Sequence, residues 1–88
     1  MGKRTFSVSM SFHTTVELDD HVIDVVDDEW RKVLYALHTP EDIAAHIAYN
    51  MVVNHSNLSS LDGWADQPDE NAWLGYVHWE TEYVDEEK

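Results

Sequence analysis

Histidine is the residue of this sequence best suited to binding a transition metal, and the chain has six of them. No two have the H-E-x-x-H spacing that places two imidazoles and a base on one helix face. His78 and Glu80 share one face of a predicted strand, and His13 on the partner strand could converge with them. Zinc needs three or four ligands at about 2.0–2.2 Å, so we predict solvated histidines, no metal ligand and no cofactor.

A loop near Gly63 is rich in carboxylates and invites comparison with a calcium site. An EF-hand loop needs oxygen ligands at alternate positions, glycine at the sixth position and glutamate at the twelfth. The carboxylates of this loop do not follow that spacing, so the sequence predicts an acidic loop without a bound cation. These carboxylates are Asp62, Asp66, Asp69 and Glu70.

The components of a catalytic site occur only as isolated residues. Serine, histidine and aspartate are all present, but the chain has no nucleophile elbow and no glycine-rich phosphate loop. Its three glycines give little scope for the close backbone approach that nucleotide phosphates need. A chain of 88 residues is also short for a deep pocket that excludes water. We therefore predict that the protein is not an enzyme and has no catalytic residues.

Carboxylates dominate the charge of the chain. Eighteen Asp and Glu residues oppose five Lys and Arg residues, which gives a formal net charge of −13 at pH 7. Between Lys32 and Lys88 there is no Lys or Arg. Binding to nucleic acid or to an anionic membrane requires cations, so the composition argues against both as direct partners. The electrostatic field of such a chain attracts a basic protein.

Regular spacing allows carboxylates to imitate nucleic acid. Alternate residues on a strand lie about 6.6 Å apart, and residues i and i+4 of a helix rise about 6 Å. Two phosphate steps along one DNA strand advance about 6.8 Å. Carboxylate rows can therefore occupy a cationic groove; the alternative is a solvated acidic coat that aids solubility or reflects a salt-rich habitat. The residues predicted to contact a partner are Asp24, Asp27, Asp28, Glu29, Glu80 and Glu82.

Two segments that alternate between apolar and polar residues are predicted to be strands. The first, from Thr5 to Leu18, has apolar residues at most even positions, which indicates one buried and one wet face. The second, from Ala72 to Val84, should pair with the first in an antiparallel sheet. The residues predicted to be buried on the first strand are Phe6, Val8, Met10, Phe12, Val16 and Leu18.

Two helices are expected between these strands. Apolar spacings of three and four predict a helix from His21 to Leu37, although His21–Val26 could instead be a strand, with the helix beginning at Asp27. Thr39 suits the N-cap of a second helix, from Pro40 to about His55, because proline is favoured at the first helical position. The short connection between the helices predicts an antiparallel helical hairpin.

Together these elements predict one α+β domain over residues 1–88. We expect a small two-layer β-α-α-β fold, in which a helical hairpin packs on one face of an antiparallel sheet. An acidic frayed tail is expected at residues 85–88. A two-stranded sheet is marginal in water, so the pattern calls for either a third strand or a homodimer through the sheet edge. The aromatic residues near the second strand should fill the core, with Tyr76 or Trp73 left for an interface.

Four runs stand out in the middle of the chain: Asp28–Arg31, Thr39–Ala44, His46–Asn50 and Leu61–Asp66. In these runs the chain resembles small uncharacterised acidic proteins of bacteriophages. The resemblance carries over no functional residue. It implies a phage or mobile-element setting, in which small acidic proteins often inhibit host enzymes or host defences, as anti-CRISPR proteins, restriction inhibitors and DNA mimics do.

The sequence therefore predicts an acidic protein-binding inhibitor or regulator. It would occlude a basic host protein that binds nucleic acid, by DNA mimicry of the anti-CRISPR or anti-restriction kind. The absence of cysteine and of any long apolar run suits the host cytoplasm, and no membrane partner is expected. Two alternatives remain: an assembly protein that dimerises through its sheet edge, and a small divalent-metal-binding protein.

Overall fold

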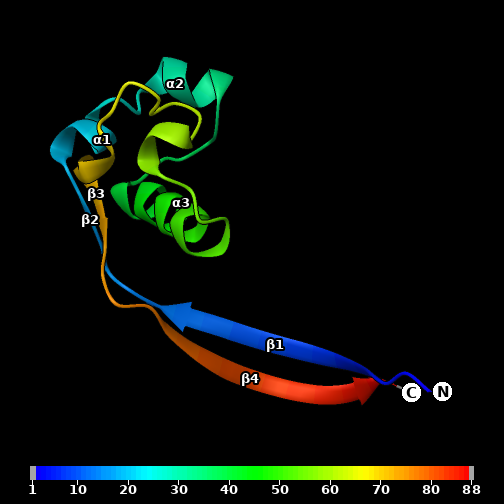
Figure 1. Cartoon of the computed structure of the whole chain (residues 1–88). Helices are drawn as coiled ribbons and strands as arrows, with labels where there is room; N and C mark the ends of the chain where they lie inside the picture. Colours follow the sequence, from blue (N-terminus) through cyan, green and yellow to red (C-terminus); the bar gives the residue numbers. More distant parts are fainter. Residues whose placement is uncertain (1, 88) are drawn as a thin grey trace.

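The computed structural model describes residues 2–87 and confirms an α+β fold with antiparallel strands. Two 3-10 turns lie between the longest helix and the third strand. Figure 1 shows a group of helices at one end of the molecule and a long pair of strands at the other. The elements are β1 (Thr5–His13), β2 (Val16–Leu18), α1 (Asp20–Asp24), α2 (Asp28–Val33), α3 (Pro40–Val53), the turns Leu58–Ser60 and Asp69–Asn71, β3 (Ala72–Leu74) and β4 (His78–Glu87).

The strands form two separate two-stranded sheets, because the two predicted strands are interrupted at positions that lie opposite each other, residues 14–15 and 75–77. β1 pairs with β4, and β2 pairs with β3. At the break the Gly75 N–H donates a hydrogen bond to the Thr15 carbonyl at 2.8 Å. A Cβ atom at position 75 would collide with the Thr15 hydroxyl, so glycine permits this close approach. We call the break, at residues 14–15 and 75–77, the elbow.

All three helices begin at a side chain that accepts a hydrogen bond from the first turn. Thr39 caps α3, and the observed helix from Pro40 to Val53 agrees with the prediction. The prediction of one continuous helix from His21 to Leu37 is wrong, because this segment is interrupted. Asp27 is extended, with φ −105° and ψ −172°, and its carboxylate caps α2, so the chain forms two short helices here.

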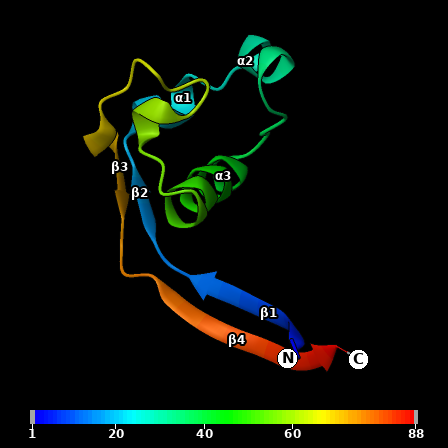
Figure 2. The same cartoon turned by 45° about the vertical axis from the view of Figure 1, so that its right-hand side comes forward.

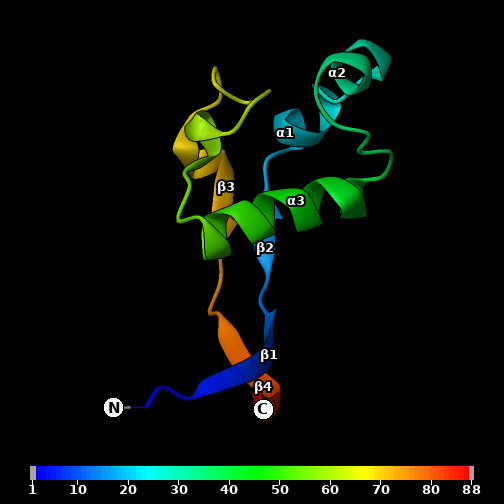
Figure 3. The ribbon, with the colours of Figure 1, turned by 90° about the vertical axis from the view of Figure 1, so that its right-hand side faces the viewer.

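The hydrophobic core lies entirely between the helices, the two turns and the short sheet, a unit that we call the helical body. Its four largest fully buried side chains are Trp64, Ile47, Leu58 and Val22. The Trp64 indole N–H donates to the Val22 carbonyl at 2.9 Å, which satisfies the one polar atom of that side chain. α3 lies across β2 and β3 on one side (Figure 3), so the helices cover only the short sheet.

β1 and β4 form a two-stranded arm that projects from the helical body (Figures 1 and 2). The radius of gyration is 16.8 Å, whereas a compact chain of this length would have about 12 Å. The longest dimension is 53 Å. Among the described residues, no helix packs broadly against the arm. The arm is therefore held by its own ladder of hydrogen bonds and by the elbow.

The uncovered arm corrects the predicted burial of the first strand. Phe6, Val8 and Met10 are 48%, 55% and 52% exposed, although their alternation indicated a buried face. Only the β2 part of the segment packs against α3 and the core, through Leu18. Alternation reports which residues share a face, but it cannot show how much of a long face the helices reach.

The predicted frayed tail also differs from the structure. β4 continues beyond Val84 to Glu87, and its last residues pair with Thr5, Phe6 and Ser7 of β1. The nine residues of β1 require a partner of similar length, which extends the second strand into the acidic end of the chain. Lys88 lies outside the described residues.

Candidate functional site

The arm has two faces of different chemical character. Residues that pair across two strands point to the same side of a sheet, so the observed register assigns each residue to a face. One face carries apolar side chains, and the other carries carboxylates of β4 opposite serines of β1. The apolar face carries Phe6, Val8, Met10, Phe12, Trp79 and Val84, with Thr81 and Glu86 on the same side, and the acidic face carries Glu80, Glu82, Asp85 and Glu87.

A β-bulge at Glu82 creates this separation. Ser9 pairs with Tyr83 and Met10 pairs with Thr81, so Glu82 has no partner on β1. The extra residue shifts the alternation by one position. Without it, Tyr83, Asp85 and Glu87 would lie on the apolar face. The Ser11 hydroxyl donates to the Glu82 carboxylate at 2.7 Å, which fixes the bulged side chain on the acidic face.

Three titratable residues meet where the arm joins the elbow. His13 pairs with His78, and the Glu80 carboxylate lies between them, with O···N distances of 3.7 Å to His13 and 3.5 Å to His78. The three side chains converge, as the sequence suggested. The distances are those of long electrostatic contacts, and they exceed both hydrogen bonds and metal–ligand bonds. Across residues 2–87, no group of three or more such side chains could hold a metal ion.

The predicted contact residues on the helices have local partners of their own. Asp27 caps α2 by accepting from the Trp30 N–H at 2.9 Å, and Asp28 forms an ion pair with Arg31 at 3.1 Å. Asp24 and Glu29 are exposed nearby. These carboxylates lie at the end of the molecule opposite the arm (Figure 1), so the structure does not bring them together with Glu80 and Glu82.

In the acidic loop, Asp69 also has a structural contact. Its carboxylate accepts a hydrogen bond from the Ser59 N–H at 3.0 Å. The Ser59 side chain, and after it this N–H, lower the pKa of Asp69. The contact joins the two 3-10 turns. Asp62, Asp66 and Glu70 are exposed in the same region. The loop is thus an acidic surface in which one carboxylate, that of Asp69, is hydrogen-bonded to the backbone of Ser59.

Positive charge on the arm is confined to its tip and to the apolar face. The sequences of β1 and β4 contain no Lys or Arg. Arg4 precedes β1 and forms an ion pair with Glu86 at 2.6 Å, and its guanidinium lies 5.4 Å from the centre of the Phe6 ring. This partner lowers the pKa of Glu86. Within residues 2–87, no Lys or Arg forms an ion pair with the four carboxylates of the acidic face.

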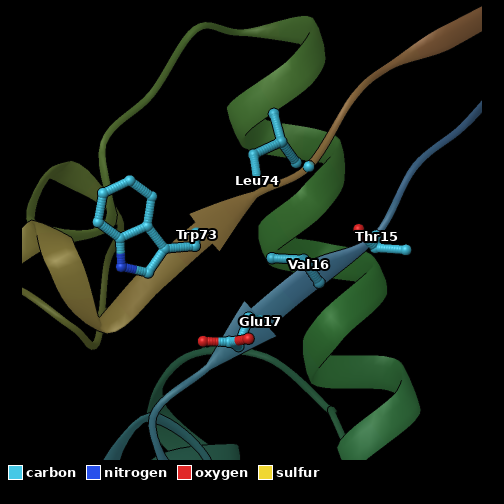
Figure 4. Close-up of a pocket in the computed structure, with 6 residues that line it drawn as sticks. Thr15, Val16, Glu17, Trp73 and Leu74 are labelled. Carbon is cyan, nitrogen blue, oxygen red and sulfur yellow. The ribbon is translucent and has the colours of Figure 1, made fainter.

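A shallow hollow lies next to the elbow (Figure 4). It has a volume of about 360 Å³ and lies along β2 and β3. Glu17 is its one ionisable lining residue and faces Trp73 across the two strands. General acid–base catalysis needs a positioned proton donor or acceptor beside a bound substrate, and one open-sided carboxylate gives no second group to work with.

His46 is the titratable side chain most closely enclosed by the helical body. Its ring centre lies 4.5 Å from that of Tyr35 and 6.0 Å from that of Trp64. Burial among these rings lowers the pKa of His46, because the charged imidazolium loses hydration. The histidine therefore belongs to an aromatic cluster that also includes Trp30, 5.0 Å from Trp64.

This burial predicts a pH-dependent stability. In the unfolded chain His46 takes up a proton near pH 6.5, whereas in the folded chain it does so only at lower pH. At a pH between the two pKa values of His46, the unfolded chain binds more protons than the folded chain. The contribution of neutral His46 to the free energy of unfolding is therefore lost as the pH falls. We expect the difference in free energy of unfolding between wild type and His46→Gln to shrink from about pH 7.5 to about pH 5. Urea titrations followed by circular dichroism measure it, and a pH-independent difference would contradict the assignment.

Comparisons of the chain with protein-family models, with curated proteins and with solved structures found no match. No helix within residues 2–87 has the length and apolar character needed to cross a membrane. The functional interpretation therefore rests on the geometry and charge of the arm.

Two residues of the acidic face were missed as contact residues by the sequence analysis. Asp85 and Glu87 were assigned to the frayed tail, whereas both are paired in β4. The length of the first alternating segment was a usable signal, because a strand that begins at Thr5 needs a partner beyond Val84. The bulge that turns Asp85 and Glu87 to the acidic face has no comparable signal in the sequence.

Proposed function

We propose that this protein is a binding protein that docks the acidic face of its arm into a cationic groove of a nucleic-acid-binding protein and blocks that groove. The observation that carries this proposal is the row of exposed carboxylates on one face of a projecting ribbon whose strands contain no Lys or Arg. Glu80 contacts His13 and His78 and Glu82 accepts from Ser11, but all of these carboxylates remain exposed to a partner.

The dimensions of the arm suit such a groove. Asp85 and Glu87 are alternate residues in a regularly paired stretch of β4, and such residues lie about 6.6 Å apart, close to two phosphate steps of DNA. The arm stands clear of the helical body (Figure 2), so it can enter a concave surface before the body collides with the partner.

The mechanism requires no covalent chemistry. Attraction between the carboxylates and a basic surface accelerates encounter, and the ribbon then fills the space that nucleic acid would occupy. Salt screens charges over about 8–10 Å at 0.1–0.15 M ionic strength. Binding through exposed carboxylates should therefore weaken steeply as salt is added.

A pair of triple charge reversals tests the proposal. In the first variant Glu80, Glu82 and Asp85 become lysine on the acidic face. In the matched control Asp62, Asp66 and Glu70 become lysine, which changes the net charge equally at the exposed loop and spares the Asp69–Ser59 contact. Wild type and both variants are immobilised and exposed to nuclease-treated bacterial extract. The captured proteins are purified and tested for displacement by a labelled DNA duplex.

We expect wild type and the control to capture a basic protein that the duplex displaces, and the arm variant to lose at least about 90% of that capture, because like charges now face each other. Equal capture by the arm variant and the control would contradict docking through the acidic face. Capture that the duplex leaves unchanged would contradict occlusion of a nucleic-acid groove.

A further inference from the structure

The apolar face of the arm is not covered by any part of the described chain. Phe6, Val8 and Met10 on β1, with Trp79 and Val84 on β4, are each between 48% and 55% exposed. The Phe12 ring contacts that of Trp79 in a tilted arrangement, with a ring-centre distance of 5.2 Å. Isolated exposed apolar residues are ordinary, but a group of apolar side chains gathered on one face of a ribbon marks an interaction surface.

The area of this face matches what a small specific interface needs. A large aromatic side chain has roughly 150–250 Å² of surface, so the five side chains that are about half exposed, together with the less exposed Phe12, supply on the order of 500 Å². Two such faces in contact bury about 1,000 Å² in total, which is the size at which specific interfaces begin.

The charges around the face favour an identical surface as its occupant. Arg4 and Glu86, the charged pair at its tip, neutralise each other. The remaining carboxylates of the arm point to the opposite side. Stacked sheets lie about 10 Å apart, and the acidic side chains of two stacked arms would point outward, about 20 Å from each other, beyond the screening length. Two copies of this acidic chain can therefore associate through their apolar faces without bringing their rows of carboxylates close to each other.

Association through the edges of the arm is less favourable. Pairing β4 with the β4 of a second copy would place like carboxylate rows on adjacent strands, about 4.8 Å apart, which is destabilising. Pairing β1 with a second β1 avoids this repulsion, but it leaves the apolar face in water on both copies. Face-to-face stacking removes that face from water and keeps the acidic residues solvated.

The arm also needs a partner for its own stability. An isolated two-stranded ribbon is marginally stable in water, and further packing on a hydrophobic face makes it stable. A second copy is present whenever the protein itself is present. We infer that the chain forms a homodimer in which the apolar faces of two arms stack, with Val8 and Val84 in the contact.

This dimer is independent of the proposed groove binding, because it uses the opposite face of the arm. A symmetric pair would present two acidic faces pointing in opposite directions. Each of them would remain free to meet a basic surface.

Sedimentation equilibrium of the whole chain tests the dimer. An apolar interface of about 1,000 Å² is expected to give a dissociation constant in the micromolar range, so wild type should be dimeric at about 100 μM. High salt should leave the dimer intact or strengthen it, because it screens the net negative charge while the contact is apolar. Val8→Thr/Val84→Thr keeps β-branched residues at two facing positions and places hydroxyls in the interface, so it should weaken dimerisation at least about tenfold.

The control changes a facing pair on the other side of the same arm. Ser9→Thr/Tyr83→Thr alters the acidic face and should leave the dimer unchanged. A wild-type chain that is monomeric at about 100 μM would overturn the inference, and the apolar face would then belong to a different partner. A dimer that resists the valine substitutions, or is lost equally in the control, would place the contact elsewhere. Loss of the dimer in the arm charge-reversal variant would also contradict a contact confined to the apolar face.

Discussion

Replacing Trp64 with alanine is expected to lower the free energy of unfolding by about 3–5 kcal/mol. Trp64 is fully buried at the centre of the helical body, among Val22, Ile47 and Leu58. The substitution leaves a cavity too large for a small body to close. It also removes the indole N–H that satisfies the Val22 carbonyl. Domains of this size have roughly 4–13 kcal/mol of stability, so urea denaturation should show a largely unfolded variant or one with a much lower midpoint.

Two further substitutions identify the origin of this effect. Trp64→Phe retains an aromatic ring but removes the donor to the Val22 carbonyl, so it should cost less than alanine while remaining destabilising. Trp73→Ala removes the same type of side chain where it is 64% exposed, and the expected change is within about 0.5 kcal/mol. Equal losses from Trp64→Ala and Trp73→Ala would contradict the assignment of the core to the helical body.

Helix α3 shows how much of the fold local chemistry determines. Thr39, Pro40 and the acidic residues after them form a start signal whose physical basis lies within one turn. Such a signal needs no knowledge of the rest of the chain, and the structure confirms it. The break at Asp27 is less accessible, because an aspartate in an apolar helical pattern can lie inside one helix or cap another. Tertiary packing of α1 and α2 decides between these two states.

The candidate site was predictable to the extent that it follows alternation. Glu80 shares a strand face with Glu82, which the alternation indicates and the hydrogen bond from Ser11, the partner of Glu80, to Glu82 supports. The side on which Asp85 and Glu87 lie depends on the bulge at Glu82, since one inserted residue reverses all later positions. Whether a helix covers the other side is also non-local. It depends on the elbow at Thr15 and Gly75, which separates the arm from α3.

The separation of the two faces reconciles two features of the sequence that oppose each other. A net charge of −13 disfavours association between copies, whereas an alternating apolar stripe favours it. With the bulge, carboxylates and apolar residues of the arm lie on opposite sides, so each can act without the other. A deletion of Glu82 would return Asp85 and Glu87 to the apolar face and would therefore disturb both proposed contacts together.

Gly63 controls the position of the aromatic cluster. Its φ of +98° is unfavourable for residues with a Cβ atom. A Cβ atom there would lie 2.5 Å from Cζ2 and Nε1 of Trp30, whose indole N–H is 3.4 Å from the Gly63 carbonyl oxygen. Because this contact involves a ring already packed on Trp64, the ring cannot shift without moving its neighbours.

We therefore expect Gly63→Ala to lower the free energy of unfolding by about 1–3 kcal/mol, through backbone strain and displacement of Trp30. The near-ultraviolet circular dichroism of the folded state should also change, because the stacking of Trp30 on Trp64 is altered. Gly2→Ala is the matched control, since its added methyl group meets no atom within 4 Å. If both variants unfold at the same urea concentration, Gly63 does not hold the Trp30 ring in place, and the cluster must be maintained by the contact of Trp30 with Tyr35 and Trp64 alone.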